Sequence, residues 1–152
     1  MNQNNSDSSI VYLIDSREKL PLSIPNSKKT YLEYGDYSIK GLENIVSVER
    51  KSIQDWVSSI TGQNRKNFEN RIERAIKKLK FYAIVIDGSY SELGDSKNWF
   101  GDTKASSVKG TATKWIVKYS IPIIFSDSRE NSSEIIQSLL KGYLYYHKEI
   151  LI

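Results

Sequence analysis

Short runs of β-branched and aromatic residues alternate along the chain with segments whose apolar residues recur at helical spacing. Runs of this kind predict buried strands, which are typically 4–8 residues long. Residues 30–44, which precede a predicted strand at residues 45–51, are expected to form one or two further strand pieces interrupted at Gly35. The predicted buried strands cover residues 10–14, 45–51, 81–86 and 122–125.

Helical periodicity begins in the middle of the chain. Ser52 stands three residues before Asp55, which is the spacing of a capping box, so we expect a helix to start there. A glycine at position 62 is expected to break or bend this helix. Further helices are predicted at residues 105–119 and 132–148.

The order of these elements predicts the fold class. Strands that precede the first helix suggest an antiparallel hairpin, and strands separated by helices suggest parallel pairing. We therefore predict an α/β fold in which a mixed sheet carries helices on both faces. One domain is expected to span residues 10–152, after a polar tail at residues 1–9 that we expect to be disordered.

Composition excludes several classes of site. The chain has 152 residues with no cysteine and a single histidine, which excludes disulfides, thiolate zinc sites and two-histidine metal sites. No apolar run approaches the roughly 20 residues that a bilayer requires, and the first residues lack the pattern of a secretory leader. We expect a cytoplasmic protein with no membrane partner. A net charge of +4 weakly favours a polyanionic partner.

Pairing across the predicted hairpin gathers polar side chains on one face of the sheet. If the Gly-Leu-Glu-Asn segment forms the loop, Tyr37 pairs with Val48 and Asp36 pairs with Glu49. Alternation then places Lys51 on the same face as the two acidic residues. Directly paired Cβ atoms lie about 4.5–5.5 Å apart, so the carboxylates repel each other unless a cation offsets their charge.

This arrangement has two interpretations. A hard divalent cation prefers oxygen ligands, and with an ammonium group nearby it supplies what phosphodiester hydrolysis requires. The alternative is an ordinary exposed hairpin face that carries a solvated Glu-Lys pair.

The motifs at these positions resemble those of the XPF-type structure-selective nucleases, the excision-repair nuclease domain family. Residues 35–37 (Gly-Asp-Tyr) and 48–55 (Val-Glu-Arg-Lys-Ser-Ile-Gln-Asp) resemble the GDx(n)ERKxxxD signature of that family. Residues 14–18 (Ile-Asp-Ser-Arg-Glu) resemble its first motif. The resemblance implies a restriction-endonuclease-like fold, of the PD-(D/E)xK superfamily.

The resemblance also implies roles for individual residues. Asp36 and Glu49 would be ligands of Mg²⁺ or Mn²⁺, with Asp15 as an additional ligand or close neighbour. Lys51 would orient or deprotonate the attacking water and stabilise the transition state. Arg50 would act at the site through its side chain, and its carbonyl group would be a further ligand.

A second group of residues is expected to support the site or to contact DNA. Asp55 would support the active site, although capping of the helix also explains it, and Glu18 would be either a supporting residue or a structural partner of an arginine. Trp99 and Phe100 would either stack on an unpaired base or anchor their loop. The basic face of the helix at residues 65–80 is either a DNA contact or simply solvated. The residues expected to bind DNA are Arg17, Arg50, Arg65 and Lys66.

Together these features predict a metal-dependent DNA endonuclease that leaves a 5′-phosphate and a 3′-hydroxyl. The expected substrate is branched, flap or single-strand-containing DNA, as in repair or recombination, although RNA or plain duplex DNA are alternatives. The family also implies a homodimer. A different alternative is a catalytically inactive DNA-binding or dimerisation subunit with the same fold. Because the chain has no room for the helicase or helix-hairpin-helix modules of larger relatives, it resembles compact nucleases of phages or mobile elements, so we expect a bacterial or phage-infected host.

Overall fold

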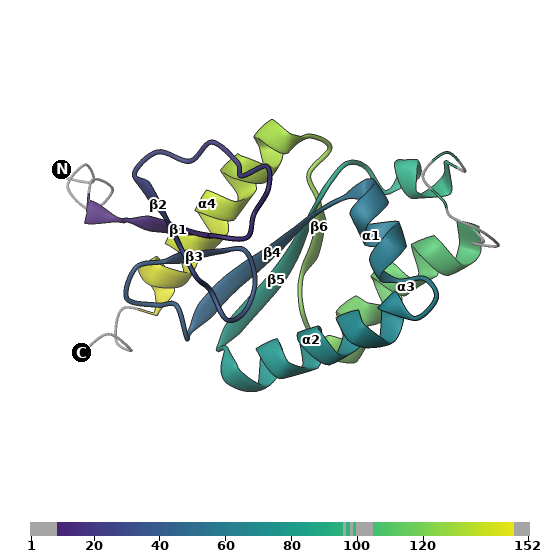
Figure 1. The fold of residues 1–152 in the computed structure, drawn as a ribbon, viewed down its shortest axis with the longest axis horizontal. Helices are drawn as coiled ribbons and strands as arrows, with labels where there is room; N and C mark the ends of the chain where they lie inside the picture. The colour runs from purple at the N-terminus through teal and green to yellow at the C-terminus, as the bar shows by residue number, and fades with distance from the viewer. Residues whose placement is uncertain (1–8, 96, 98, 100–104, 148–152) are drawn as a thin grey trace.

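Among the described residues, a six-stranded mixed sheet forms the centre of the fold (Figure 1). The structure is a computed structural model and describes residues 9–95, 97, 99 and 105–147. The expected tail at residues 1–9 lies outside these residues except for Ser9. The elements in chain order are β1 (Tyr12–Asp15), β2 (Ser27–Thr30), β3 (Tyr37–Ile39), β4 (Val46–Ser52), α1 (Ile53–Ser59), α2 (Asn64–Lys78), β5 (Phe81–Asp87), η2 (Ser91–Gly94), α3 (Ala105–Tyr119), β6 (Ile123–Phe125) and α4 (Arg129–Tyr146).

The strands lie in the order β2-β1-β3-β4-β5-β6. The central strands β1, β3 and β4 pair antiparallel, whereas β4, β5 and β6 pair parallel, which confirms the predicted mixed sheet. The sequence analysis did not predict β2, a parallel partner of β1 at the edge of the sheet. Its Ser-Lys-Lys-Thr sequence carries no apolar signal because the strand is largely exposed.

The predicted hairpin register is confirmed, since Tyr37 pairs with Val48. Just before β3, Gly35 has a φ of +72°, and a Cβ atom at this position would come within 3.0 Å of the Ser47 Cβ atom. Only glycine fits both the left-handed backbone and this close approach. The backbone can then continue so that the Asp36 N–H donates to the Val48 carbonyl at 2.9 Å.

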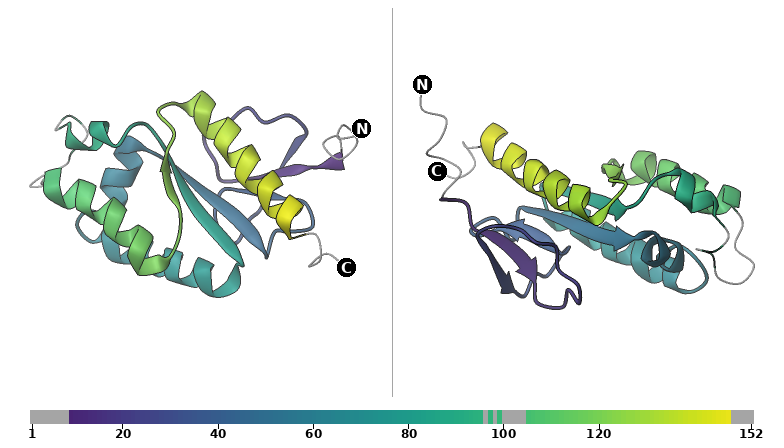
Figure 2. Two further views of the ribbon diagram at one scale, coloured as in Figure 1. Left: turned by 180° about the vertical axis from the view of Figure 1, so that it is seen from behind. Right: turned by 90° about the horizontal axis from the view of Figure 1, so that it is seen from above.

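Two hydrophobic clusters cover opposite faces of the sheet, as alternate residues of β5 show. Ile84 and Ile86 join a cluster with α1, α2 and α3, while Val85 joins a second cluster with α4. Figure 2 shows α2 and α4 on opposite sides of the sheet. In the first cluster, the rings of Trp56 and Trp115 pack edge to face with centroids 5.7 Å apart.

The helix boundaries follow their caps. The Ser52 hydroxyl accepts a hydrogen bond from the Asp55 N–H at 3.1 Å, so α1 begins where the sequence predicts. The expected break near Gly62 separates α1 from α2. The last helix, α4, begins three residues before the predicted start because the Ser128 hydroxyl caps it through the Asn131 N–H. Among the described helices, none is both long and apolar enough to cross a bilayer.

Candidate active site

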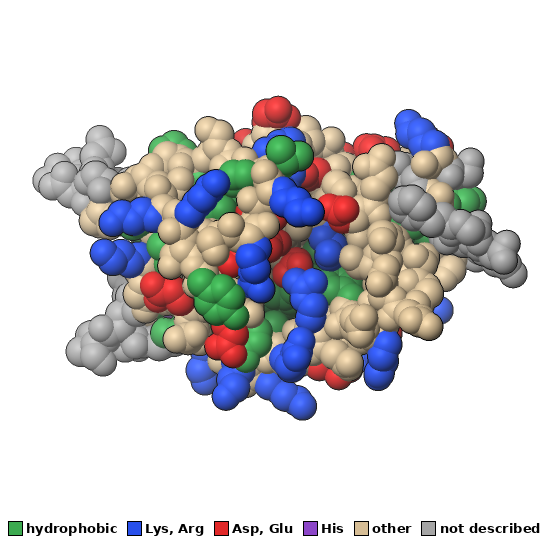
Figure 3. All heavy atoms as spheres, viewed as in Figure 1, with side chains coloured by type: hydrophobic (Ala, Val, Ile, Leu, Met, Phe, Trp, Pro, Cys, Tyr) green, Lys and Arg blue, Asp and Glu red, His purple; other side chains and the backbone are tan. Residues whose placement is uncertain are grey.

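A polar cleft of about 560 Å³ opens on the face of the sheet that carries α2. Figure 3 shows acidic side chains in a depression near the centre of this face, with lysine and arginine side chains around the depression. The residues that line the cleft come from strands β1, β4 and β5, the loops after β1 and before β3, and α2. The lining residues are Asp15, Arg17, Tyr31, Glu33, Tyr34, Gly35, Asp36, Glu49, Arg71, Arg74, Ala75 and Tyr82.

Asp36, directly before β3, and Glu49 of the adjacent strand β4 both line this cleft. Glu49 is only 3% exposed, and the Asp36 carboxylate accepts a hydrogen bond from the Arg50 backbone N–H at 2.8 Å. Burial raises the pKa of Asp36 well above its usual range, and the negative charges of Glu49 and Glu18 raise it further. The fold therefore holds two carboxyl groups where their charges are mutually unfavourable.

Donors from three elements converge on the Glu49 carboxylate. Arg71 of α2 donates to one oxygen at 2.9 Å, and the Tyr82 hydroxyl of β5 donates to the other at 3.2 Å. The Lys51 ammonium lies 3.9 Å from the first oxygen and 4.5 Å from the centroid of the Phe68 ring. Glu49 and Lys51 thus share one face of β4, as alternation predicts.

Asp15 lies in the same cleft, but both of its oxygens already accept hydrogen bonds. Arg17 donates to one oxygen at 2.8 Å, and the Leu32 backbone N–H donates to the other at 3.0 Å. Within the described part of the chain, no three acidic or histidine side chains converge as a group that could hold a metal ion. Asp36, Glu49 and Asp15 are the carboxylates of the cleft that could contribute to holding a divalent cation, and Asp15 also orients Arg17.

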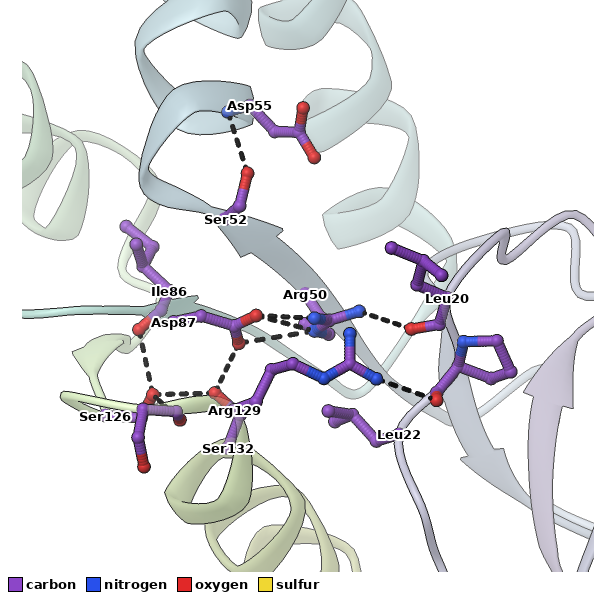
Figure 4. A network of polar contacts seen from close by, with 12 residues as sticks. Leu20, Leu22, Arg50, Ser52, Asp55, Ile86, Asp87, Ser126, Arg129 and Ser132 are labelled. Atoms are coloured by element: carbon purple, nitrogen blue, oxygen red, sulfur yellow. Dashed lines mark hydrogen bonds and ion pairs between the residues drawn. The ribbon is translucent and has the colours of Figure 1, made fainter. Parts of the chain in front are cut away.

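The structure does not bring the Arg50 side chain into this cleft. Its guanidinium group binds the Asp87 carboxylate at 2.5 Å and the Leu20 carbonyl at 2.9 Å, on the face that carries α4 (Figure 4). The Ser132 hydroxyl of α4 donates to the same carboxylate. The residue between Glu49 and Lys51 on a strand points to the opposite face, so the structure does not place this side chain where its expected catalytic and DNA-binding roles require it.

Arg65 also differs from its expected role. Its guanidinium group donates to the Thr111 hydroxyl at 2.9 Å and to the Ile60 carbonyl at 3.2 Å, and it lies 5.2 Å from the centroid of the Trp115 ring. Arg65 therefore joins helices α2 and α3, and its side chain, 38% exposed, lies outside the residues that line the cleft. Its neighbour Lys66 is exposed, outside the residues that line the cleft.

The two supporting residues have structural partners. Glu18 accepts a hydrogen bond from the Tyr37 hydroxyl at 2.8 Å and lies 3.4 Å from an Arg50 nitrogen, which favours its structural interpretation. Asp55 is exposed at the start of α1, and its backbone N–H takes part in the Ser52 cap.

The sequence analysis did not single out Arg71, Arg74 or Tyr82. The spacing of residues along α2 does contain a signal for Arg71. This residue follows Phe68 by three positions, so it lies at the margin of the buried stripe of the helix. Tyr82 pairs with Ser47 in the sheet, two positions before Glu49, and therefore shares the face of Glu49.

Comparisons with known proteins identify the family and the fold. A family model described as "ERCC4 domain" matches residues 5–139. A putative ATP-dependent RNA helicase from Methanocaldococcus jannaschii is 28% identical over 132 residues, which cover 84% of this chain and 15% of that protein. The chain thus spans a small part of this curated relative.

The fold is similar to that of XPF from Aeropyrum pernix, with a TM-score of 0.68 and 17% identity over 91% of this chain and 69% of that chain. XPF from the same organism in complex with DNA gives a TM-score of 0.69 and 17% identity over 90% of this chain and 66% of that chain. These relatives are archaeal, so the comparisons do not support the expected bacterial or phage origin.

Proposed function

Because the chain belongs to the ERCC4 domain family of XPF-type nuclease domains, we propose that it is a metal-dependent endonuclease that hydrolyses phosphodiester bonds in DNA. The observation that carries the proposal is the convergence of Asp36 and Glu49 in one cleft, with the Lys51 ammonium 3.9 Å from Glu49. The complex of XPF from Aeropyrum pernix with DNA supports the choice of nucleic acid.

Asp36 and Glu49 offer the oxygen ligands that Mg²⁺ or Mn²⁺ prefers. When bound, such an ion supplies a Lewis acid that polarises a phosphoryl oxygen and lowers the pKa of water. The raised pKa of Asp36 supports this assignment, because a positive charge held by both carboxylates would offset the burial and repulsion that raise it.

The other groups of the cleft bind and orient the substrate. Lys51 stabilises the negative charge that develops on the phosphate in the transition state. Arg71 and Arg74 offer guanidinium groups at the mouth of the cleft for neighbouring phosphates. Water attacks the phosphorus, the bond from phosphorus to the 3′ oxygen breaks, and that oxygen takes up a proton. The products are a 5′-phosphate and a 3′-hydroxyl.

A cleavage assay tests this proposal. The protein is incubated with Mg²⁺ or Mn²⁺ and labelled flap, splayed-arm, junction, duplex and single-stranded DNAs of matched sequence. We expect cleavage of the branched or single-strand-containing DNAs. Glu49→Gln should lower the rate by at least about 100-fold, because it removes a charged ligand. Glu134→Gln on the exposed side of α4 is the matched control and should cleave at the wild-type rate.

The rival function gives a different result. A catalytically inactive binding or dimerisation subunit would bind these DNAs, but the wild type would cleave none of them with any divalent ion. Undiminished cleavage by Glu49→Gln would show instead that the metal site is misassigned. The homodimer and the role in repair or recombination stay predictions.

A further inference from the structure

An aromatic ring lies exposed at the mouth of the cleft. Tyr31 is 64% exposed, whereas Tyr12, Tyr37 and Tyr82 of the neighbouring strands are each 5% exposed or less. Tyr31 lines the same cleft as Asp36 and Glu49. A single exposed aromatic residue is common on protein surfaces, so its surroundings decide what it means.

Tyr31 forms a pair with Arg17. The central carbon of the Arg17 guanidinium lies 4.9 Å from the centroid of the Tyr31 ring, within the range of a cation–π contact. Arg17 is held in turn by the Asp15 carboxylate at 2.8 Å and by the Leu32 carbonyl at 2.7 Å. Leu32, which follows Tyr31 directly, is only 1% exposed and also donates its N–H to Asp15.

The Tyr31 ring and the Arg17 guanidinium are therefore held in place by the same two buried residues, Asp15 and Leu32. A pair fixed in this way loses little conformational freedom when it binds a ligand. The pair also lies next to the proposed catalytic centre, because the Asp15 backbone N–H donates to the Asp36 carbonyl at 2.8 Å.

We propose that Tyr31 and Arg17 form a stacking platform for an unpaired nucleobase close to the bond that is cleaved. The proposal rests on the proposed function for the position of that bond. An aromatic face with an adjacent guanidinium binds single-stranded nucleic acid by stacking, and this contact is worth about 1–3 kcal/mol per base. Bases in a duplex already stack on their neighbours. The platform therefore selects DNA with a single-stranded segment at the cleft.

The other aromatic candidate from the sequence does not serve this role. The Trp99 indole N–H donates to the Leu93 carbonyl at 2.8 Å, and its ring packs against the cluster of α1–α3. Trp99 thus anchors its loop, and Phe100 lies outside the described residues.

Binding without catalysis tests the platform. Fluorescence anisotropy in EDTA measures the Kd of the full chain for a labelled single-stranded oligonucleotide and for a blunt duplex of the same length. Tyr31→Ala should weaken single-strand binding by about 5- to 100-fold and duplex binding by less than about 2-fold. Tyr31→Phe and Tyr31→Trp keep a ring and should bind as the wild type does. Tyr145→Ala removes a ring that is 65% exposed on α4 and should change neither Kd.

A second readout reports stacking directly. An oligonucleotide that contains 2-aminopurine should lose fluorescence on binding to the wild type and to Tyr31→Phe, but not to Tyr31→Ala at saturating protein. Equal thermal unfolding midpoints of the variants exclude a folding defect. The proposal is overturned if the wild type fails to bind the single strand, or if Tyr31→Ala weakens neither DNA or both equally.

These outcomes separate the platform from the nuclease. If the wild type cleaves no DNA with Mg²⁺ but Tyr31→Ala loses single-strand affinity, the platform stands as a binding site and the proposed function fails. If the wild type cleaves DNA but Tyr31→Ala binds single strands normally, the nuclease stands and the platform is wrong.

Discussion

The Asp36 carboxyl group is held where ionisation is unfavourable. Its burial and the charge of Glu49 both raise its pKa. Among the described contacts, the one backbone hydrogen bond that opposes this rise is donated by the Arg50 N–H. A carboxyl group in such a position lowers the stability of the metal-free protein. A fold that accepts this cost is consistent with a site that requires a cation.

Replacing this carboxyl group should therefore stabilise the metal-free protein. Because the pKa of Asp36 is raised in the folded state, its contribution to stability is present below the unfolded pKa of about 4 and is lost as the pH rises through the folded pKa. Asp36→Asn keeps a neutral group that can still accept the Arg50 hydrogen bond. In EDTA at pH 7 we expect its melting temperature to rise by about 2–4 °C, equivalent to roughly 1 kcal/mol, and the gain to vanish near pH 4. An unchanged or lower melting temperature at pH 7 would contradict the pKa shift.

At the scale of elements, a buried ion pair links β4 and β5 to the layer of α4 on the face opposite the cleft. Arg50 of β4 and Asp87 of β5 are 10% and 8% exposed in their side chains, and Ser132 attaches α4 to the same carboxylate (Figure 4). Arg50 also reaches the Leu20 carbonyl in the loop after β1. We infer that Arg50 helps to position β4 so that Glu49 faces the cleft.

Breaking this pair should destabilise the fold without affecting the proposed DNA contacts. Asp87→Ala removes the main carboxylate partner of a buried guanidinium, and loss of a buried ion-pair partner typically costs about 3–5 kcal/mol in the free energy of unfolding measured by urea denaturation. Asp95→Ala removes an exposed partner of Lys97 and should cost nothing measurable. At a temperature where Arg50→Met is folded, the salt dependence of DNA binding should equal that of the wild type. If the affinity of Arg50→Met for DNA depended less on salt concentration than that of the wild type, the Arg50 side chain would contact DNA, against this account.

At the scale of the whole molecule, the two faces of the sheet differ in their structural roles. The α4 face is fixed by apolar packing and by the Arg50 network, while the α2 face carries the cleft. This division follows from the sequence where alternation is strict, as in the hairpin of Tyr37 and Val48. The polar edge strand β2 could not be predicted, because its stability comes from pairing with β1 and not from its own side chains.

Two residues show how motif resemblance and periodicity can disagree. Alternation places Arg50 opposite to Glu49, and the structure follows alternation even though Arg50 lies inside the motif. Arg65 precedes Phe68 by three residues and Ile72 by seven, so helical spacing places it beside the buried stripe of α2, where Thr111 and Trp115 bind it. Helical spacing places Arg71 at the margin of the same buried stripe, but its contact with Glu49 could not be predicted, because that contact depends on how α2 lies on the sheet.

The central claim, that Asp36 and Glu49 together hold a divalent cation, is tested most directly by counting bound Mn²⁺. Loss of the free-ion signal in electron paramagnetic resonance measures binding to the wild type and to the double variant Asp36→Asn/Glu49→Gln at neutral pH without DNA. We expect one Mn²⁺ per wild-type chain, competed by Mg²⁺, and affinity at least about 10-fold weaker in the double variant. Equal Mn²⁺ affinity in both proteins, or no binding to the wild type at millimolar Mn²⁺, would contradict the claim.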